Sequence, residues 1–541
     1  MRPFPGLLYF LMFWALTQLF YYPTWDAGFV ADFTGLMVRF EGRTAAGILD
    51  CFGFPALQQV LNAILYGMYS LFGLRPLPWY FVFTSLHALN AWLLFQFARG
   101  LLQDWNARNA LWVSLAAALF FLLCPYQSEP VTYRVCFNFL FSGTSTLGVL
   151  LLARRWLAHG RPAQLWGLQA LFMLGLFTFE LQLALPFLTS LLVAVVPRPW
   201  FSRSKAWLLL SLPQFLSIAL YFLLNRLLLG VWVGHYGAGV HLRFQPLEVL
   251  GNVQRYALKL TAWVRHYPHP WKEALFGYFS MPGLVIGITA LAVLLLLWGS
   301  WRFRSMAGHW KMAWFAALGY GLTIAPVSNL YFNFLLHISN DRYSYLASAF
   351  FFLLLASLLG VLPKKWLIAV ALAYLLGSSF FLHQNNQRWA ASNDIYQGLL
   401  EDFRWHKAPA LFFLNLPDNY QGVWLFGDYG GNDRGFHHAL KYIKGEDIQQ
   451  PEGIREIAYY NMTKPEDAVS AQVDSSGQVR VEFDQWGNWW MYRGIGMGGG
   501  YETERYRVVN QGHHYFLTPF EVPAGSVFLL QKGARWEEVH Y

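Results

Sequence analysis

Residues 78–98 read PWYFVFTSLHALNAWLLFQFA and contain no aspartate, glutamate, lysine or arginine. About 20 mostly apolar residues in a helix are enough to cross the hydrocarbon core of a bilayer, so this stretch predicts a transmembrane helix. Because such windows recur along most of the chain, a signal peptide does not explain them. Apolar windows lie at 4–22, 78–98, 110–125, 136–153, 164–179, 181–197, 206–225, 280–300, 312–327, 345–362 and 366–382, which predicts about eleven spans.

The overall composition agrees with a membrane protein. Of the 541 residues, 56% are hydrophobic and only 13% are charged, against roughly 25% charged residues in soluble domains. A purely water-soluble fold is therefore not expected. The formal charge of +9 is explained by cytoplasmic loops and anionic lipid headgroups, and no nucleic-acid-binding motif is present. We expect membrane lipids, not nucleic acid, as partners.

The positions of basic residues predict the orientation of the spans. If Met1 is cytoplasmic, basic residues gather at every inner end, and Asp104 is the only acid among them. This alternation follows the positive-inside tendency and puts everything after about residue 383 on the outer side. The loop at 226–278 is also basic, but it is long enough for its charges to weigh less. The inner-end residues are Arg2, Arg99, Arg108, Arg154, Arg155, Arg161, Arg198, Arg203, Lys205, Arg302, Arg304, Lys311, Lys364 and Lys365.

Two segments do not fit the pattern of spans. Residues 54–74 are apolar but are interrupted by glutamine, asparagine and glycine, so we expect an interfacial helix on the outer leaflet; a full span would invert every later loop. After residue 383 acids and turns become frequent. We therefore predict a transmembrane domain at 1–383 and a soluble outer domain at 384–541. The latter is a small α/β or mainly β domain, helical over 385–407, with strands in the runs ALFFLNL, QVRVEF and SVFLLQK.

Three cysteines, Cys51, Cys124 and Cys136, are too few for a disulfide framework and lack the spacing of a zinc site. Cys124 and Cys136 form a pair only if their loop folds back on itself. We expect them to be small packing residues.

Acidic residues mark the outer ends of several spans. Asp26 and Asp32 lie among aromatic and aliphatic side chains just after the first window, where partial drying raises a carboxylate pKa and makes it a useful base. Glu129 follows the third window in LLCPYQSEPVTYR, and Glu180 lies at the apex of a short helical pair. A buried acid at a membrane boundary is a functional candidate because its burial is costly, although a structural contact explains Glu180 equally well.

Arginines near the same face are candidate phosphate ligands. Arg342, with Asp341 and Tyr343, precedes the tenth window in ISNDRYSYLASAFFFLLL. A guanidinium at headgroup level grips a phosphate with two parallel hydrogen bonds. The alternative is a pair with Asp341 or a contact with lipid headgroups. Arg134 and the basic loop at 226–278 offer further phosphate partners.

Together these segments resemble GT-C glycosyltransferases. The likeness covers roughly residues 1–400 and is greatest to the membrane region of the transmembrane-and-tetratricopeptide O-mannosyltransferases and their bacterial relatives. In that family an acid in the first outer loop is the proposed base, a Pro-x-x-x-Glu segment follows the third span, another acid marks a later helical turn, and an acid-Arg-Tyr motif precedes a late span. By position these are Asp26 or Asp32, Glu129, Glu180, and the trio Asp341, Arg342 and Tyr343.

Two features depart from the family pattern. No tetratricopeptide repeat follows the membrane region, which leaves the acceptor open, and Tyr126 stands where a histidine is expected, which weakens a metal site. Some relatives use a divalent cation. Glu129 and a first-loop aspartate offer oxygen ligands for Mg²⁺ or Mn²⁺, but without a spacing rule we assign no metal ligands.

The resemblance implies an inverting transferase that uses a polyprenyl-phosphate-linked sugar. Arg342 and Arg134 would hold the donor phosphate, and an aspartate would deprotonate the hydroxyl of a protein, glycan or lipid acceptor. We favour Asp32 over Asp26, because in VADFTG it lies deeper in an apolar stretch. Glu129 would join the catalytic set, with Glu180, Asp341 and Tyr343 supporting it.

The expected location is a bacterial inner membrane with the C-terminal domain in the periplasm, in preference to the endoplasmic reticulum. Two other function classes are open. A lipid or glycolipid transporter or flippase also carries acids and arginines within a helical bundle, and a non-catalytic scaffold would bind glycans with its outer domain, whose segment DQWGNWWMYRGIGMGGGYETERYR is rich in aromatic residues. Release of sugar from the donor separates an enzyme from both.

Overall fold

The structure is a computed structural model. It describes residues 5–44, 47, 56–197, 200–232, 245–278, 281–328, 338–426, 435–464, 469–483, 489–491 and 499–541. The expected role of Cys51 falls outside these residues, as do positions 484–488 and 492–498 of the aromatic segment.

Every apolar window coincides with a helix. Proline occupies the first position of several helices, including those that start at Pro76, Pro162, Pro246 and Pro282, where its missing N–H has no partner to lose. The helices of the first part are α1 (Pro5–Tyr21), α2 (Asp32–Phe40), α4 (Gln59–Phe72), α5 (Pro76–Asp104), α6 (Ala110–Leu122), α7 (Ser128–Thr132), α8 (Phe137–His159), α9 (Pro162–Leu176), α10 (Leu185–Val195), α11 (Arg203–Leu229), α13 (Pro246–Ala262), α14 (His269–Tyr278), α15 (Pro282–Arg302), α16 (Gly308–Ser328), α17 (Tyr345–Leu359) and α18 (Lys364–Asp402). Short 3₁₀ turns are η1 (Tyr22–Thr24), η2 (Pro125–Gln127), η3 (Glu180–Ala184), η4 (Val264–His266), η5 (Phe303–Ser305) and η6 (Ile338–Ser344).

Fewer helices than expected are long and apolar enough to cross a membrane. Among the described residues six satisfy both conditions, or seven if α6 and the bent segment after it count as one span. The expected count of about eleven is therefore not confirmed. Three windows correspond to helices of only 17, 15 and 11 residues, namely α1, α9 and α10, and the window at 110–125 ends in a 52° bend.

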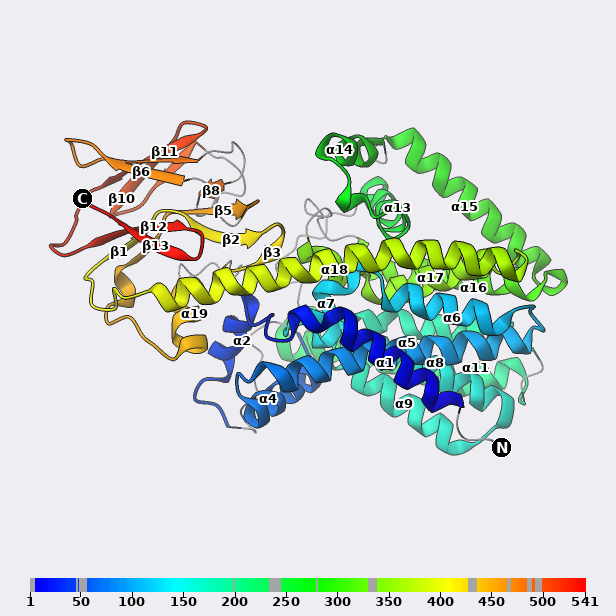
Figure 1. Cartoon of the computed structure of the whole chain (residues 1–541). Coiled ribbons are helices and arrows are strands. Elements are labelled where there is room, and N and C mark those ends of the chain that lie inside the picture. Colours follow the sequence, from blue (N-terminus) through cyan, green and yellow to red (C-terminus); the bar gives the residue numbers. More distant parts are fainter. Residues whose placement is uncertain are drawn as a thin grey trace.

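The long helices run side by side as one bundle (Figure 1). In it α5 packs against α1, α6 and α8, and α16 packs against α17. The segment expected to be an interfacial helix does form a helix, α4, which packs against α5 and α8.

Helix α18 joins the bundle to the C-terminal part. It continues without a break for 39 residues, and Figure 1 shows it crossing the bundle and ending beside the β domain. The expected domain boundary at 383/384 falls inside this helix, so the division at that point stays a prediction. Of the helix expected over 385–407, residues 385–402 form the second half of α18, which ends at Asp402.

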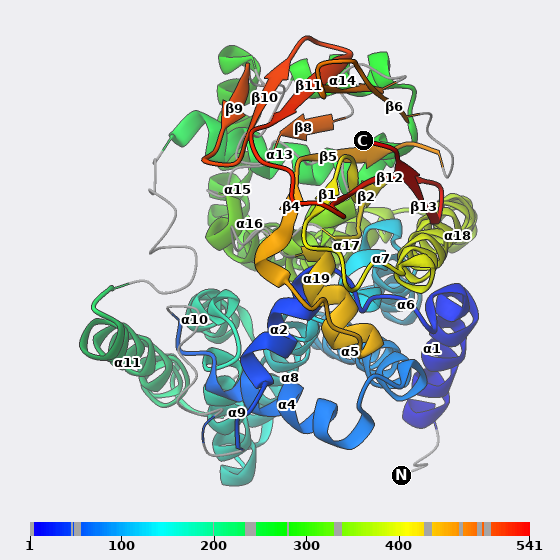
Figure 2. The same cartoon turned by 90° about the vertical axis from the view of Figure 1, so that its left-hand side faces the viewer.

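The C-terminal part is a β domain of three sheets (Figure 2). The runs ALFFLNL, QVRVEF and SVFLLQK form strands as expected. In the first sheet β1 pairs in parallel with β12 and β4, and β13 pairs antiparallel with β12. The strand orders are β13-β12-β1-β4, β6-β7-β11-β10-β9 and β3-β2-β5-β8. The elements are β1 (Leu411–Phe413), β2 (Leu416–Tyr420), β3 (Val423–Trp424), α19 (Gly435–Ala439), η7 (Leu440–Lys444), η8 (Pro451–Gly453), β4 (Ile454–Glu456), β5 (Ala458–Met462), β6 (Val469–Val473), β7 (Val479–Phe483), β8 (Trp489–Met491), β9 (Gly500–Glu502), β10 (Tyr506–Asn510), β11 (His514–Pro519), β12 (Val527–Lys532) and β13 (Arg535–Val539).

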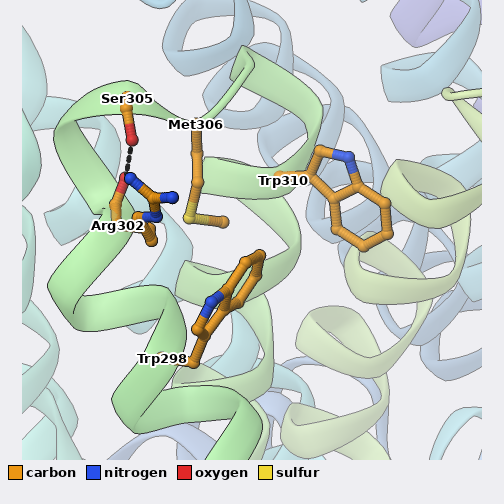
Figure 3. A pocket seen from close by; sticks show the side chains of 5 residues that line it. All are labelled: Trp298, Arg302, Ser305, Met306 and Trp310. Carbon is orange, nitrogen blue, oxygen red and sulfur yellow. Dashed lines mark hydrogen bonds between the residues drawn. The ribbon is translucent and has the colours of Figure 1, made fainter.

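Within the described part of the chain, the α5–α6, α8–α9 and α15–α16 connections, which carry inner-end basic residues, lie at the end of the bundle away from the β domain (Figure 1). There Arg154 pairs with Asp104 at 2.7 Å. A pocket of about 280 Å³ at this end is lined by Trp298, Arg302, Ser305, Met306 and Trp310 (Figure 3). It lies between α15 and α16, and none of the candidate site residues lines it.

Cys124 and Cys136 are both buried free thiols. The expected packing role is confirmed for these two residues, and they do not form a disulfide.

Candidate active site

Except for Glu180, the predicted site residues come from segments far apart in the chain that meet at the β-domain end of the bundle. The turn η6 contacts α7, η2 and β3, while α18 contacts η1, η2 and α7. The loop after α1, the turn after α6 and the turn before α17 therefore share one neighbourhood. This convergence is what the sequence interpretation required.

Arg342 lies at the centre of this neighbourhood. Its backbone N–H donates to Oε2 of Glu129 at 2.7 Å, and its Nη1 lies 3.4 Å from Oε1 of the same carboxylate. The same Nη1 lies 3.9 Å from Oδ2 of Asp32. One guanidinium thus faces two carboxylates, one from the first loop and one from α7.

The two carboxylates differ in access to solvent. Glu129 is fully buried and Arg342 is largely buried, whereas 43% of the Asp32 side chain is exposed. Because both oxygens of Glu129 face Arg342, its geometry favours holding the arginine in place over contact with an acceptor. A catalytic role for Glu129 stays a prediction.

Aromatic rings enclose the guanidinium. Its Cζ lies 5.4 Å from the ring centre of Tyr343 and 5.7 Å from that of Tyr133. The Tyr133 hydroxyl also accepts a hydrogen bond from the backbone N–H of Asp32 at 2.8 Å. Tyr133, which the sequence interpretation did not single out, therefore touches both Asp32 and Arg342. The available signal was its place four residues after Glu129, next to Arg134.

Asp341 does not pair with Arg342. Its carboxylate accepts from Nη1 of Arg265 at 2.6 Å, also pairs with Nη2 of that arginine, and lies 2.5 Å from Nζ of Lys259. All three side chains are nearly or fully buried. The alternative of an Asp341–Arg342 ion pair is therefore wrong. Tyr126, where the family pattern has histidine, places its ring 4.8 Å from Arg265 and 4.9 Å from Lys259.

Further basic residues extend this group. The charges of Arg265, Lys272 and Arg388 act on His266. Burial, reinforced by these positive charges, lowers the pKa of His266 to about 3 and also lowers the pKa of Lys272. An excess of positive charge beside the arginine-carboxylate cluster suits an anion. Sequence reasoning named Lys272 only as part of the basic loop and missed Arg388, which lies in the second half of α18.

Arg134 is fully buried under the first loop. Its Nη2 donates to the Thr24 carbonyl at 3.1 Å, and its backbone N–H donates to the Gly28 carbonyl at 3.2 Å. Gly28 has φ of +98°, and a Cβ there would lie 2.1 Å from the Thr132 carbonyl oxygen. These contacts favour a role in holding the loop, and phosphate binding by Arg134 stays a prediction.

The expectation that Asp32 lies deeper than Asp26 is wrong. Asp32 is exposed at the start of α2, whereas Asp26 is half-buried in the loop. Burial raises the pKa of Asp26, with a smaller contribution from Asp394, while Arg134 opposes the shift. The pattern VADFTG misled because the apolar neighbours of Asp32 turn inward from a helix whose first residue faces outward.

Glu180 lies with a different set of residues. Its carboxylate accepts from Tyr221 at 3.3 Å and from Gln58 at 3.5 Å. These partners place it beside α11 and the start of α4. A supporting role in catalysis stays a prediction, and the contacts fit the structural explanation.

The described residues do not fit a divalent cation at this site. No group of three or more histidine, cysteine, aspartate or glutamate side chains is placed to hold a metal within the described part of the chain. Nη1 of Arg342 already faces both Asp32 and Glu129, so positive charge occupies the position where a cation would use these carboxylates. The donor set therefore differs from what the Mg²⁺ or Mn²⁺ of some GT-C relatives would need.

Comparisons with known proteins give two solved structures. No protein-family model matches the chain, and the search of curated proteins gives no match. Both structures are of ArnT from Cupriavidus metallidurans. One, bound to undecaprenyl phosphate, is 15% identical, covers 81% of this chain and 85% of its own, and has a TM-score of 0.32. The other, in the apo state, is 14% identical, covers 94% and 97%, and has a TM-score of 0.33.

Because both TM-scores are below 0.5, the likeness to ArnT says nothing about this site. The chemistry of the site has to be inferred from the residues of this chain.

Proposed function

We propose that this protein is an integral membrane glycosyltransferase that moves a sugar, with inversion, from a polyprenyl-phosphate donor to an acceptor hydroxyl. One observation carries the proposal. Arg342 lies within 3.4 Å of Glu129 and 3.9 Å of Asp32, so an exposed carboxylate and a phosphate-binding group lie side by side at one end of an apolar bundle. Transfer from a lipid phosphate needs this combination.

The donor phosphate binds at Arg342, with Lys272 and Arg388 adding positive charge on the same side. Glu129 holds Arg342 through its backbone N–H and side chain. Because the phosphate leaves with growing negative charge, fixed cations in a partly dry site stabilise the transition state more than the ground state.

Asp32 acts as the base. It removes the proton of the acceptor hydroxyl while the acceptor oxygen forms its bond to the anomeric carbon. The bond from that carbon to the phosphate oxygen breaks on the opposite face, and polyprenyl phosphate leaves. A single displacement inverts the anomeric configuration. Exposure of Asp32 gives the acceptor access to it.

The direct test is sugar release by the purified full-length protein in nanodiscs. A panel of undecaprenyl-phosphate-linked sugars is supplied with simple hydroxyl acceptors, and free polyprenyl phosphate and glycosylated acceptor are measured together. Equal amounts of the two products support a transferase. Movement of intact donor between leaflets without cleavage would instead make the protein a flippase, and binding without either event would make it a scaffold.

Arg342→Lys should lower kcat/KM about tenfold, because lysine keeps the charge but loses the two-pronged grip on phosphate. Arg302→Lys is the matched control, because Arg302 is an exposed arginine at the opposite end of the bundle. This change should leave kcat/KM unchanged. Equal rates for the Arg342 variant and the wild type would remove Arg342 from the donor site.

The proposed location is a bacterial inner membrane with the C-terminal domain in the periplasm. The ends of α5, α8 and α15 that carry inner-end basic residues point away from the β domain (Figure 1), which supports this orientation. Labelling of single-cysteine variants at Lys365 and Lys532 with a membrane-impermeant reagent tests it: only the latter should react in intact spheroplasts.

A further inference from the structure

Helix α2, which begins at Asp32, lies between the bundle and the C-terminal domain. Its apolar face packs on the bundle, where Phe33 meets Trp79 at 5.6 Å and Phe40 meets Tyr66 at 5.4 Å between ring centres. Both α19 and η7 of the C-terminal domain also contact α2, as Figure 2 shows. Asp32, the candidate base, therefore lies on a helix that contacts both the bundle and the C-terminal domain.

The C-terminal domain contacts α2 at two places, which we call clamps. The first clamp is a backbone hydrogen bond just before the start of α2. The N–H of Ala31 donates to the carbonyl of Leu425, in the C-terminal domain, at 3.0 Å. Ala31 has φ of 45° and ψ of −114°, a conformation that residues with a Cβ rarely adopt unless their surroundings impose it. The Leu425 carbonyl is one of the groups that impose it, immediately before Asp32.

The second clamp is a set of side-chain contacts at the C-terminal end of α2. Oε1 of Glu41 lies 3.0 Å from Nζ of Lys441, and Oε2 accepts from the Tyr442 hydroxyl at 2.5 Å. Glu41 is the residue that follows the last turn of α2, and both partners lie in η7. One carboxylate thus receives two donors from the C-terminal domain.

The contact between Asp32 and Arg342 is too weak to fix α2 by itself. At 3.9 Å and with Asp32 well exposed, such an ion pair contributes little. The bundle holds α2 through the rings of Phe33 and Phe40 and through the Tyr133 hydroxyl, which accepts from the Asp32 N–H. The C-terminal domain adds contacts at both ends of the helix, through Leu425 at one end and through Lys441 and Tyr442 at the other.

We propose that the C-terminal domain positions Asp32 against Arg342 by clamping both ends of α2, with Lys441 and Tyr442 as positioning residues. The clamp itself is a property of the fold, whereas its effect on sugar transfer rests on the proposed function. The β domain then controls the geometry of the transfer step.

Hydrogen exchange of the full-length protein tests the clamp directly. Glu41→Ala and Lys441→Ala should each speed exchange of the α2 amides about two- to fivefold, the range that corresponds to loss of an exposed ion pair. The double variant should add little beyond Glu41→Ala alone, because that change already removes the carboxylate with which Lys441 pairs. Lys441→Arg should restore wild-type exchange. Peptides from α5 and from β12 should not change in any of these variants.

Lys532→Ala is the matched control. Lys532 pairs with Glu537 on the β12–β13 hairpin, where both side chains are about as exposed as the clamp residues, so its loss should leave α2 exchange at the wild-type rate. Unchanged α2 exchange in both clamp variants would overturn the proposal, as would fully additive effects in the double variant.

Activity separates the clamp from the proposed function. If the protein transfers sugar, the clamp variants should lower kcat while KM for the donor stays the same, and Lys441→Arg should recover kcat. Lower kcat with unchanged α2 exchange would overturn positioning. If no transfer occurs at all, the proposed function fails while the exchange result still decides whether the C-terminal domain holds α2.

Discussion

Asp32→Asn is expected to lower kcat for sugar transfer about 10²- to 10⁴-fold, the usual contribution of a general base. The amide is nearly the same size and keeps the helix start, but it cannot take the proton from the acceptor hydroxyl. KM for the donor should change little, since the phosphate is held by Arg342 and its basic neighbours. Steady-state kinetics on purified protein, with the melting temperature as a folding check, measure both quantities.

Asp26→Asn is the matched control for this change. Asp26 lies in the same loop and is half-buried, but the charges that act on it are those of Asp394 and Arg134. The loss in kcat should stay below about tenfold, well short of a full base effect. If Asp26→Asn abolishes transfer and Asp32→Asn does not, the roles are reversed. Full activity in both folded variants would eliminate a first-loop base.

Asp341→Asn is expected to destabilise the protein by about 3–5 kcal/mol, because it leaves Lys259 and Arg265 buried without a counter-charge. Both cations contact this one carboxylate, and both are nearly or fully inaccessible to water. The melting temperature in nanodiscs should fall by several degrees or more, and the yield of folded protein should drop. The position of Arg342 should also change, because this residue follows Asp341 directly in the chain.

Asp104→Asn provides the comparison. Asp104 pairs with Arg154 at 2.7 Å, but both side chains are partly exposed at the other end of the bundle. Such a pair contributes about 0–1 kcal/mol, so the melting temperature should hardly move. Equal losses for Asp104→Asn and Asp341→Asn would contradict the large cost assigned to the buried group. Replacing Asp341, Lys259 and Arg265 together by apolar residues should recover most of the lost stability.

Sequence reasoning located the helices well because their apolar windows are long. The expected number of spans is not confirmed, since α9 and α10 have only 15 and 11 residues. Local hydropathy cannot decide whether such a pair of short helices crosses the membrane or turns back. The strands in QVRVEF and SVFLLQK were predictable from alternating or continuous apolar runs with polar turns around them.

The site was only partly predictable. Glu129 and Arg342 were foreseeable because charged residues stand out beside apolar windows. The partners of Asp341 were not, because Lys259 and Arg265 lie among other basic residues of a long loop and only the fold selects them. The exposure of Asp32 was missed for a related reason: sequence shows which neighbours are apolar but not which way a helix turns its first residue.

The length of α18 matters to both parts of the protein. At 1.5 Å per residue its 39 residues span about 58 Å, nearly twice the roughly 30 Å thickness of a hydrocarbon core. The helix is therefore long enough both to cross a hydrocarbon core and to continue along the C-terminal domain, where it contacts β2, β3 and β13.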